Sequence, residues 1–167
     1  AAGAHAIVCE RVPAYPTGNI TFIQVQNAAE ALGYIAANFY DNPSEKISVV
    51  AVTGTNGKTT TTQLIAHIVK QTGHKVGYTT TDGVYIQNQL MMRGDCTGPV
   101  SAEFVLKDPA VDFAVLETAR GGILRAGLGF HNCDIAIVTN IAEDHLGLQD
   151  IDTIEQLTRV KAVVPAS

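Results

Sequence analysis

Hydrophobic residues in the larger, C-terminal part of the chain fall into short continuous runs separated by longer amphipathic stretches. The runs at 47–52, 113–117 and 135–139 are almost wholly apolar and have the length of a strand. Such runs are typical of parallel strands covered on both faces. Apolar residues recur at helical spacing over 64–69 and 153–164, which predicts helices. We therefore expect an α/β fold with a mainly parallel sheet flanked by helices.

Two further elements are expected between the first two buried runs. Residues 76–81 predict another strand, and 84–90 predict a hairpin that turns near Asn88.

The first 46 residues are organised differently. Residues 6–10 and 21–25 predict short strands, and Asn27 with Glu30 three residues later is typical of a helix start. This segment is too short to bury a core of its own. We expect 1–46 to be a partial N-terminal domain ending in a linker at 41–46, and 47–167 to be a separate central domain.

Composition narrows the possible partners. Charged residues make up 16% of the 167 residues and the net charge is -5, with no basic run, which argues against nucleic acid. No apolar run reaches the ~18 residues of a membrane span. The three cysteines are widely spaced and predict neither a zinc site nor a disulfide framework. We expect a cytoplasmic protein without a membrane partner, and the sequence leaves the oligomeric state open.

The segment after the first buried run is typical of a phosphate-binding loop. Residues 54–59 read GTNGKT, which is two residues tighter than the general GxxxxGK[ST] loop. Its glycines allow the backbone to approach phosphates, Lys58 supplies a positive charge and Thr59 offers a hydroxyl to Mg²⁺. An ordinary strand-to-helix turn is the alternative. The predicted nucleotide-binding residues are Gly54, Thr55, Asn56, Gly57, Lys58, Thr59, Thr60 and Asn140.

Polar residues also follow the other two buried runs. Glu117 ends the second run, and Asn140, Asp144 and His145 follow the third. The carboxyl ends of parallel strands lie along one edge of a sheet, so these groups should converge. We predict a magnesium site formed by Thr59, Glu117 and His145. The alternatives are a solvated strand end for Glu117 and a capping pair for Asp144 and His145.

These motifs resemble the central ATPase domain of the Mur ligase superfamily, which uses the shortened loop. The runs at 78–83, 97–101, 116–125 and 144–148 make residues 49–167 similar to the cyanophycin synthetase branch. Residues 1–48 instead resemble the end of the N-terminal domain of UDP-MurNAc-tripeptide synthetases. Those enzymes usually have TTP where this chain has TGP at 97–99, and EVSSH where it has ETAR from Glu117, which argues against the UDP-sugar acceptor.

The resemblance implies ATP-dependent amide formation through an acyl phosphate, using an acceptor carboxylate and an amino acid. In cyanophycin synthetases the reaction joins arginine to the β-carboxylate of aspartate. Lys58 and His145 would be catalytic, with ATP and Mg²⁺ as cofactors. The superfamily carries a C-terminal domain that closes over ATP, so we expect a fragment truncated before that domain and slow by itself. The alternatives are a UDP-MurNAc-tripeptide synthetase fragment and a non-catalytic nucleotide-binding module.

Lys161 lies on the apolar stripe that Ile154, Leu157 and Val164 form on the closing helix. The resemblance implies that this lysine is a third catalytic residue, carbamylated and holding a second Mg²⁺ with His145. A surface lysine whose ammonium reaches water is the alternative.

Two arginines, Arg120 and Arg125, lie in a predicted glycine-rich loop after Glu117. They either bind an acidic acceptor or are solvated surface side chains.

Overall fold

The computed structural model describes residues 4–14, 20–39, 47–143, 146–147 and 151–167. The chain divides into two compact units, Ala1–Asp41 and Asn42–Ser167. The division falls five residues before the expected boundary, inside the expected linker, whose structure lies outside the described residues. Each unit is described by itself.

The first unit contains a two-stranded sheet and one helix. Strand β1 (Ala6–Cys9) pairs in parallel with β2 (Thr21–Gln24), and α1 (Ala28–Phe39) follows. The side chain of Asn27 accepts hydrogen bonds from the backbone N–H groups of Ala29 and Glu30, so it caps this helix as expected. Several large apolar side chains of the unit are exposed: Ile7, Val12, Ile23, Leu32, Tyr34, Ile35 and Phe39.

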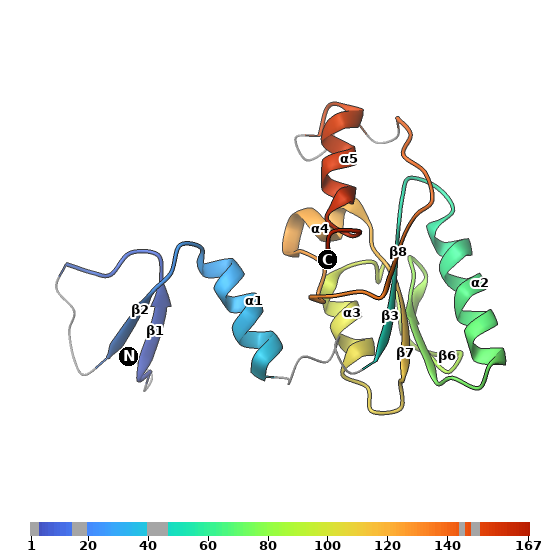
Figure 1. The fold of residues 1–167 in the computed structure, drawn as a ribbon, viewed down its shortest axis with the longest axis horizontal. Coiled ribbons are helices and arrows are strands. Elements are labelled where there is room, and N and C mark those ends of the chain that lie inside the picture. The colour runs from blue at the N-terminus through green and yellow to red at the C-terminus, as the bar shows by residue number, and fades with distance from the viewer. Residues whose placement is uncertain (1–3, 15–19, 40–46, 144–145, 148–150) are drawn as a thin grey trace. The chain divides into compact units, whose positions relative to one another are not determined.

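The second unit is built on a six-stranded sheet in the order β6-β5-β4-β7-β3-β8 (Figure 1). Its elements are, in chain order, β3 (Ser48–Thr53), α2 (Lys58–Gln71), β4 (Val76–Thr79), β5 (Gly83–Ile86), β6 (Gln89–Arg93), α3 (Pro99–Leu106), β7 (Phe113–Glu117), α4 (Arg120–Ala126), β8 (Ile135–Val138) and α5 (Ile154–Ala162). Strands β4, β7, β3 and β8 are parallel, and β5 and β6 continue the sheet in antiparallel order. The expected α/β fold is confirmed.

The sheet is covered on both faces, which explains the continuous apolar runs. Val49, Ala114 and Leu116 pack in one buried cluster with the α3 residues Ala102 and Val105. The alternate strand residues, Val50, Val52 and Val115, pack with Ala66 of α2 on the other face. Figure 1 shows α2 and α3 on opposite sides of the sheet.

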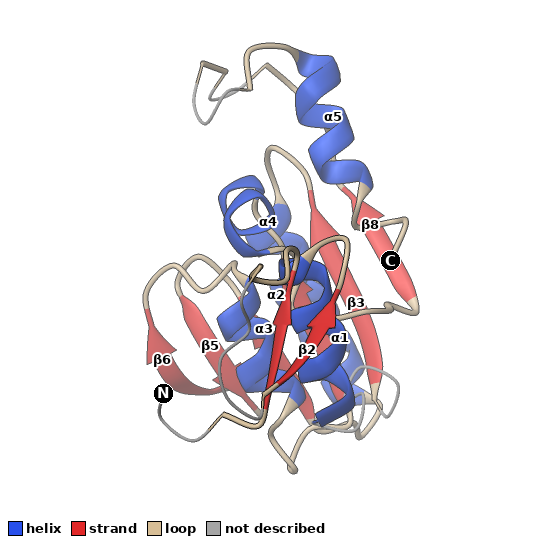
Figure 2. Cartoon of the chain, turned by 90° about the vertical axis from the view of Figure 1, so that its left-hand side faces the viewer, coloured by secondary structure: helices blue, strands red, loops and turns tan. Residues whose placement is uncertain are grey.

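The expected hairpin is present, and the structure places it at one edge of the sheet (Figure 2). Gln87 and Asn88 have φ angles of 49° and 69°, the pair of positive values that a two-residue type I′ turn requires. The second strand of the hairpin runs on to Arg93. Helix α5 also forms as expected, with a reciprocal capping box between Thr153 and Gln156.

Two helices were not anticipated. Helix α3 has no clean apolar stripe, because Ser101 and Ala102 are buried while Val100 is 73% exposed. The prediction of a glycine-rich loop around Arg120 and Arg125 is wrong, because both residues lie on helix α4. Gly122 serves close packing, because a Cβ there would meet the carbonyl oxygen of Thr97 at 2.9 Å.

No helix in the described ranges combines the length and the apolar character that crossing a membrane requires.

Candidate active site

The phosphate loop connects β3 to α2 and is shaped by two glycines. Gly54 has a φ of 141°, and a Cβ there would lie 2.0 Å from the hydroxyl oxygen of Thr139, so no other residue fits without displacement. Gly57 adopts a left-handed conformation, with a φ of 82°, directly before the first residue of α2. The glycines that the sequence singled out therefore have separate roles, close approach at one and a sharp turn at the other.

The end of β8 holds this loop. The backbone N–H of Thr55 donates to the carbonyl oxygen of Asn140 over 2.9 Å. The Asn140 amide accepts from the N–H of Asn56 at 3.1 Å and donates to the Asn56 carbonyl oxygen at 3.0 Å. The Thr139 hydroxyl donates to that same oxygen at 2.7 Å. Asn140 was predicted to place nucleotide or metal. In the structure its side chain bonds to both the N–H and the carbonyl oxygen of Asn56, and so holds the loop backbone.

The start of α2 supplies the anion-binding features of the loop. Backbone N–H groups in the first turn of a helix have no partner within the helix and carry the positive end of its dipole. Lys58 lies in this turn, and its ammonium donates to the carbonyl oxygen of Thr55 over 2.7 Å. Thr60 is exposed on the same turn. Its backbone N–H is one of the first-turn groups that can bind a phosphate.

Glu117 and Thr59 lie side by side, as the converging strand ends predicted. The Thr59 hydroxyl donates to Oε2 of Glu117 over 2.8 Å, and it lies 3.2 Å from the hydroxyl of Thr81. Glu117 is 1% exposed, and burial raises the pKa of its carboxyl, although the Thr59 hydrogen bond and the charge of Lys58 oppose that shift. Its other oxygen, Oε1, is buried without a hydrogen-bond partner.

A divalent cation fits this position. An orphaned, buried carboxylate oxygen next to a threonine hydroxyl offers the hard oxygen ligands that Mg²⁺ prefers. No group of three His, Cys, Asp or Glu side chains gathers anywhere in the described part of the chain. A cation here would take its other ligands from substrate phosphates, from water or from residues outside the described ranges. The predicted ligand His145 and its neighbour Asp144 lie outside the described residues.

Lys161 is buried next to the loop. Its side chain is 3% exposed, and its ammonium donates to the carbonyl oxygen of Gly54 over 2.7 Å. Burial, and then the charges of Lys58 and Arg120, lower its pKa from 10.5 to about 8. The alternative of a surface lysine that reaches water is therefore wrong. Leu157 and Val164 are buried with it, so the apolar stripe is the buried face of the helix.

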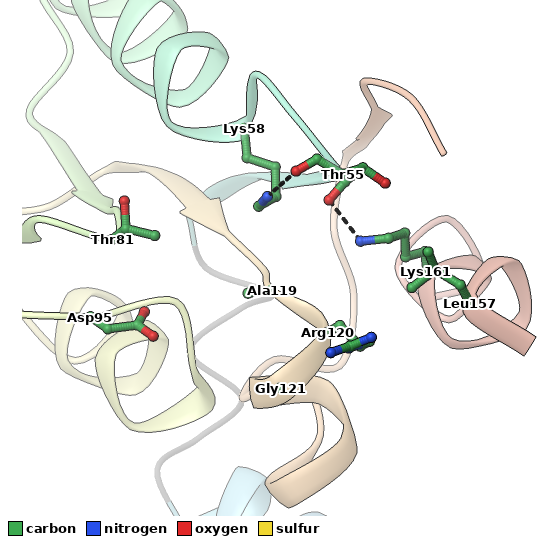
Figure 3. Close-up of a pocket in the computed structure, with 10 residues that line it drawn as sticks. Thr55, Lys58, Thr81, Asp95, Ala119, Arg120, Gly121, Leu157 and Lys161 are labelled. Atoms are coloured by element: carbon green, nitrogen blue, oxygen red, sulfur yellow. Dashed lines mark hydrogen bonds between the residues drawn. The ribbon is translucent and has the colours of Figure 1, made fainter. Parts of the chain in front are cut away.

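A cavity of about 370 Å³ lies between Lys58 of the phosphate loop and Lys161 of α5 (Figure 3), and Thr59 and Glu117 are not among its lining residues. Its lining comes from the phosphate loop, the ends of β4 and β6, the start of α4 and the inner face of α5: Gly54, Thr55, Lys58, Thr81, Asp95, Ala119, Arg120, Gly121, Leu157 and Lys161. Arg125 is not among them. The structure thus separates the two candidate arginines and places only Arg120 at the cavity.

Sequence reasoning missed Thr81 and Asp95. Thr81 lies two residues past the end of β4, so the polar residues at a strand end were the available signal. Asp95 follows β6, which is an antiparallel strand. The expectation that polar residues converge at the carboxyl ends of parallel strands therefore does not apply to it. It is brought to this edge because the N–H of Cys96 bonds to the carbonyl oxygen of Thr80 at 3.0 Å.

The fold and the loop together define an α/β domain with a glycine-lysine-threonine loop at the carboxyl edge of its parallel strands. A family model, the Mur ligase middle domain, matches residues 52–164. The chain belongs to the Mur ligase family, which confirms the resemblance drawn from the motifs.

Two groups of curated proteins are similar to the chain. Cyanophycin synthetase of Geminocystis herdmanii is 61% identical over 129 residues, which is 77% of this chain and 15% of that protein. The UDP-N-acetylmuramoyl-L-alanyl-D-glutamate–2,6-diaminopimelate ligase of Parabacteroides distasonis is 34% identical over 163 residues, which is 95% of this chain and 33% of that protein. The chain thus spans a third or less of the length of either relative.

Solved structures agree on the fold. A UDP-N-acetylmuramoyl-L-alanyl-D-glutamate–2,6-diaminopimelate ligase superposes with a TM-score of 0.72 at 24% identity, over 94% of this chain and 32% of that one. A bifunctional folylpolyglutamate synthase/dihydrofolate synthase from Yersinia pestis, complexed with AMPPNP and a Mn ion, superposes with a TM-score of 0.60 at 25% identity. That match covers 84% of this chain and 40% of that one.

Proposed function

We propose that the chain is the ATP-binding middle domain of an ATP-dependent acid–amino acid ligase of the cyanophycin synthetase type. The observation that carries the proposal is that the loop lysine, the candidate metal-binding pair and the buried lysine all lie against the same loop: Lys58, the Thr59–Glu117 pair and Lys161. The identity of 61% with a cyanophycin synthetase supports the branch. A cytoplasmic location is part of the proposal, supported by three unpaired cysteine thiols.

The chain's own groups suit phosphoryl transfer from ATP to an acceptor carboxylate. The loop backbone and the first turn of α2 would bind the phosphates, and Lys58 would turn from Thr55 to neutralise charge on the transferred group. Mg²⁺, when bound, supplies further neutralisation of that charge. Thr59 and Glu117 would hold it, with His145 as the remaining proposed ligand. The resulting acyl phosphate would then be attacked by the amine of an amino acid.

A second candidate is a UDP-MurNAc-tripeptide synthetase type of activity. The specific observation in its favour is the length of similarity, since the diaminopimelate ligase of Parabacteroides distasonis aligns over 95% of this chain. The acceptor separates the two candidates. ADP release that depends on an aspartate polymer supports the cyanophycin type, whereas release that depends on a UDP-sugar dipeptide supports the other.

Carbamylation of Lys161 is a separate part of the proposal. The lysine is buried among Leu157 and Val164 and lies beside the loop that would hold the phosphates. A carbamate there would replace a buried cation with an anion able to hold a second metal. Intact-mass measurement and ¹³C NMR with labelled bicarbonate should show an adduct in the native chain and none in Lys161→Met. Identical spectra for the two proteins would contradict it.

Nucleotide binding is tested by removing one charge. We expect Lys58→Ala to weaken Mg·ATP binding about tenfold or more, the size expected for losing a charge-assisted contact to phosphate. Calorimetry on the 167-residue chain measures this directly. The control is Lys75→Ala, which removes a lysine that is exposed and outside the cavity. Equal affinities in folded Lys58→Ala and native protein would refute the proposed site, and binding without acceptor-dependent ADP formation would leave only a nucleotide-binding module.

A further inference from the structure

The walls of the cavity differ in charge. Lys58, Arg120 and Lys161 contribute three basic groups, and Asp95 is the one acidic side chain among the described lining residues. Figure 3 shows Asp95 on the side of the cavity opposite Arg120 and Lys161. Asp95 is also near enough to Glu117 for its charge to act on that carboxyl. The cavity therefore has a cationic side and a smaller anionic side.

The backbone around Asp95 holds its carboxylate in place. The backbone N–H of Gly94 donates to the carbonyl oxygen of Asp82 at 3.1 Å, which fixes the chain where it leaves β6. Within the side chain, Oδ1 accepts both the N–H of Thr97, at 3.3 Å, and the Thr97 hydroxyl, at 2.7 Å. Both of these bonds use the same oxygen, so Oδ2 is left for a ligand in the cavity.

The charges of the substrates decide what can bind there. ATP and an acceptor carboxylate are anions, which the three cations attract and which Asp95 repels. The incoming amino acid is the substrate that carries an ammonium group. We propose that Asp95 binds the ammonium of the incoming amino acid and positions it to attack the acyl phosphate. This inference rests on the proposed ligase function and adds a residue to it.

The role is that of a binding group. In the attack, the nitrogen lone pair forms a bond to the acyl carbon, and the bond from that carbon to the phosphate oxygen breaks, with the electron pair leaving on phosphate. An ammonium has no free lone pair, so it first loses one proton to solvent. The second proton leaves as the amide forms and passes to the released phosphate. Asp95 accepts a hydrogen bond from the nitrogen and holds it at the anionic side while this happens.

Magnesium is the other cation that a carboxylate attracts, and the structure favours the amine at Asp95. Glu117 is buried, bonded to Thr59 and has an orphaned oxygen, all of which suit a metal ligand. Asp95 is exposed and lines the cavity without a buried, orphaned oxygen of the kind that Glu117 has. The metal therefore belongs to Glu117 and the amine to Asp95.

The test compares Asp95→Asn with Asp82→Asn in the full-length enzyme. Asparagine keeps an acceptor for Thr97 and removes only the charge, and Asp82 is an exposed aspartate outside the cavity. We expect Asp95→Asn to raise the KM of the amine substrate about tenfold and to leave the KM values of ATP and acceptor unchanged. Asp82→Asn should match the native enzyme. Asp95→Glu should recover part of the affinity for the amine, because it restores the charge.

Hydroxylamine separates this inference from the proposed function. It is a neutral nucleophile at pH 7 and traps acyl phosphates as hydroxamates without needing an ammonium site. Native enzyme and Asp95→Asn should form hydroxamate at the same rate. Absence of hydroxamate from the native enzyme would overturn the proposed function. Hydroxamate formation with an unchanged amine KM in Asp95→Asn would overturn only the role of Asp95.

Manganese binding tests whether Asp95 is a metal ligand. EPR titration with Mn²⁺ and ATP should give the same metal affinity for native enzyme and Asp95→Asn, with Glu117→Gln as the variant that weakens it. Weaker Mn²⁺ binding in Asp95→Asn would make Asp95 a metal ligand and overturn its assignment to the amine.

Discussion

Glu117 and Lys161 are charged side chains with almost no exposure, at 1% and 3%, in a domain whose interior is otherwise largely apolar. Burying an ionised group without full compensation lowers stability. The Glu117 carboxylate accepts a hydrogen bond from Thr59, and the Lys161 ammonium donates one to Gly54. Such groups are common where a protein gives up stability to keep a functional site.

Glu117→Gln should therefore stabilise the metal-free domain. Glutamine can still accept the Thr59 hydrogen bond, and it removes a buried negative charge. We expect the melting temperature at pH 7 to rise by a few degrees, the shift that ~1 kcal/mol produces in a domain of this size. The pKa of Glu117 is raised in the folded state, so this gain is full above that pKa and shrinks as pH falls through it toward 4.5.

Thermal unfolding with and without Mg²⁺ and nucleotide checks this prediction. The ligands should stabilise the native chain and have a much smaller effect on Glu117→Gln. Glu103→Gln, at a half-exposed pair with Lys107, is the control and should change little. A lower melting temperature for metal-free Glu117→Gln would contradict the argument.

The buried Lys161 should give the stability of the fold a pH dependence opposite in direction to that of Glu117. Its pKa is about 8 in the folded chain against 10.5 ordinarily, so the folded state binds fewer protons between these values. The stability lost by burying the ammonium is full below pH 8 and is recovered as pH rises toward 10.5. Relative to Lys161→Met, the native chain should gain stability across that window. Urea unfolding of both proteins at pH 7.5 and pH 10 measures the difference, and parallel pH profiles would refute it.

At the scale of elements, the phosphate loop depends on the strand beside it. The end of β8 bonds to Thr55 and Asn56 through Thr139 and Asn140, so the loop is held before any phosphate arrives. Such pre-organisation reduces the conformational entropy lost on binding.

Two glycine substitutions in this loop should differ in cost. Gly54→Ala meets Thr139 at 2.0 Å and the Asn140 carbonyl oxygen at 3.0 Å, and it also forces a φ of 141° on alanine. We expect a loss of about 3 kcal/mol or more. Gly57→Ala has open space and only the left-handed φ of 82°, so about 1 kcal/mol is expected. Chemical denaturation ranks the two, and equal losses would mean that the contact with β8 is not what requires glycine.

Asn140→Ala should weaken both folding and nucleotide binding. The change removes both amide bonds to Asn56 but keeps the backbone bond from Thr55. We expect a loss of about 1–2 kcal/mol of stability and a several-fold weaker Mg·ATP affinity, because the loop must then be ordered on binding. Calorimetry measures the affinity. An unchanged value would show that the loop keeps its shape without this amide.

At the scale of the whole molecule, the described cavity belongs to one unit. All of its lining residues lie in Asn42–Ser167. Deleting residues 1–41 should therefore leave the Mg·ATP affinity and the melting temperature of the remaining unit nearly unchanged, as calorimetry and thermal unfolding can measure. A loss of affinity beyond about tenfold would show that the first unit supports the site.

The sequence was most informative where a pattern has one physical cause. Apolar runs identified the buried strands, and the polar residues after them led to Thr59 and Glu117 meeting. It was least informative where tertiary packing overrides local signals. Helix α4 contains two adjacent glycines, which argue locally against a helix, and one of them, Gly122, allows its close packing on residues 97–98. Asp95 reaches the site only through the path of the hairpin, which no local pattern encodes.

For strands buried on both faces, the apolar pattern alone does not fix the register in which they pair. Residues 49–52 are all 3% exposed or less, so a slip of one position would exchange one buried apolar face for the other with little hydrophobic penalty. Polar clamps oppose the slip instead: Asp134 accepts the N–H of Val49 at 2.7 Å, and the Thr53 hydroxyl donates to the Thr118 carbonyl oxygen at 2.9 Å. In this chain a few hydrogen bonds at the strand ends fix the register of the sheet. An error there would move Gly54 away from Glu117 while leaving the core well packed.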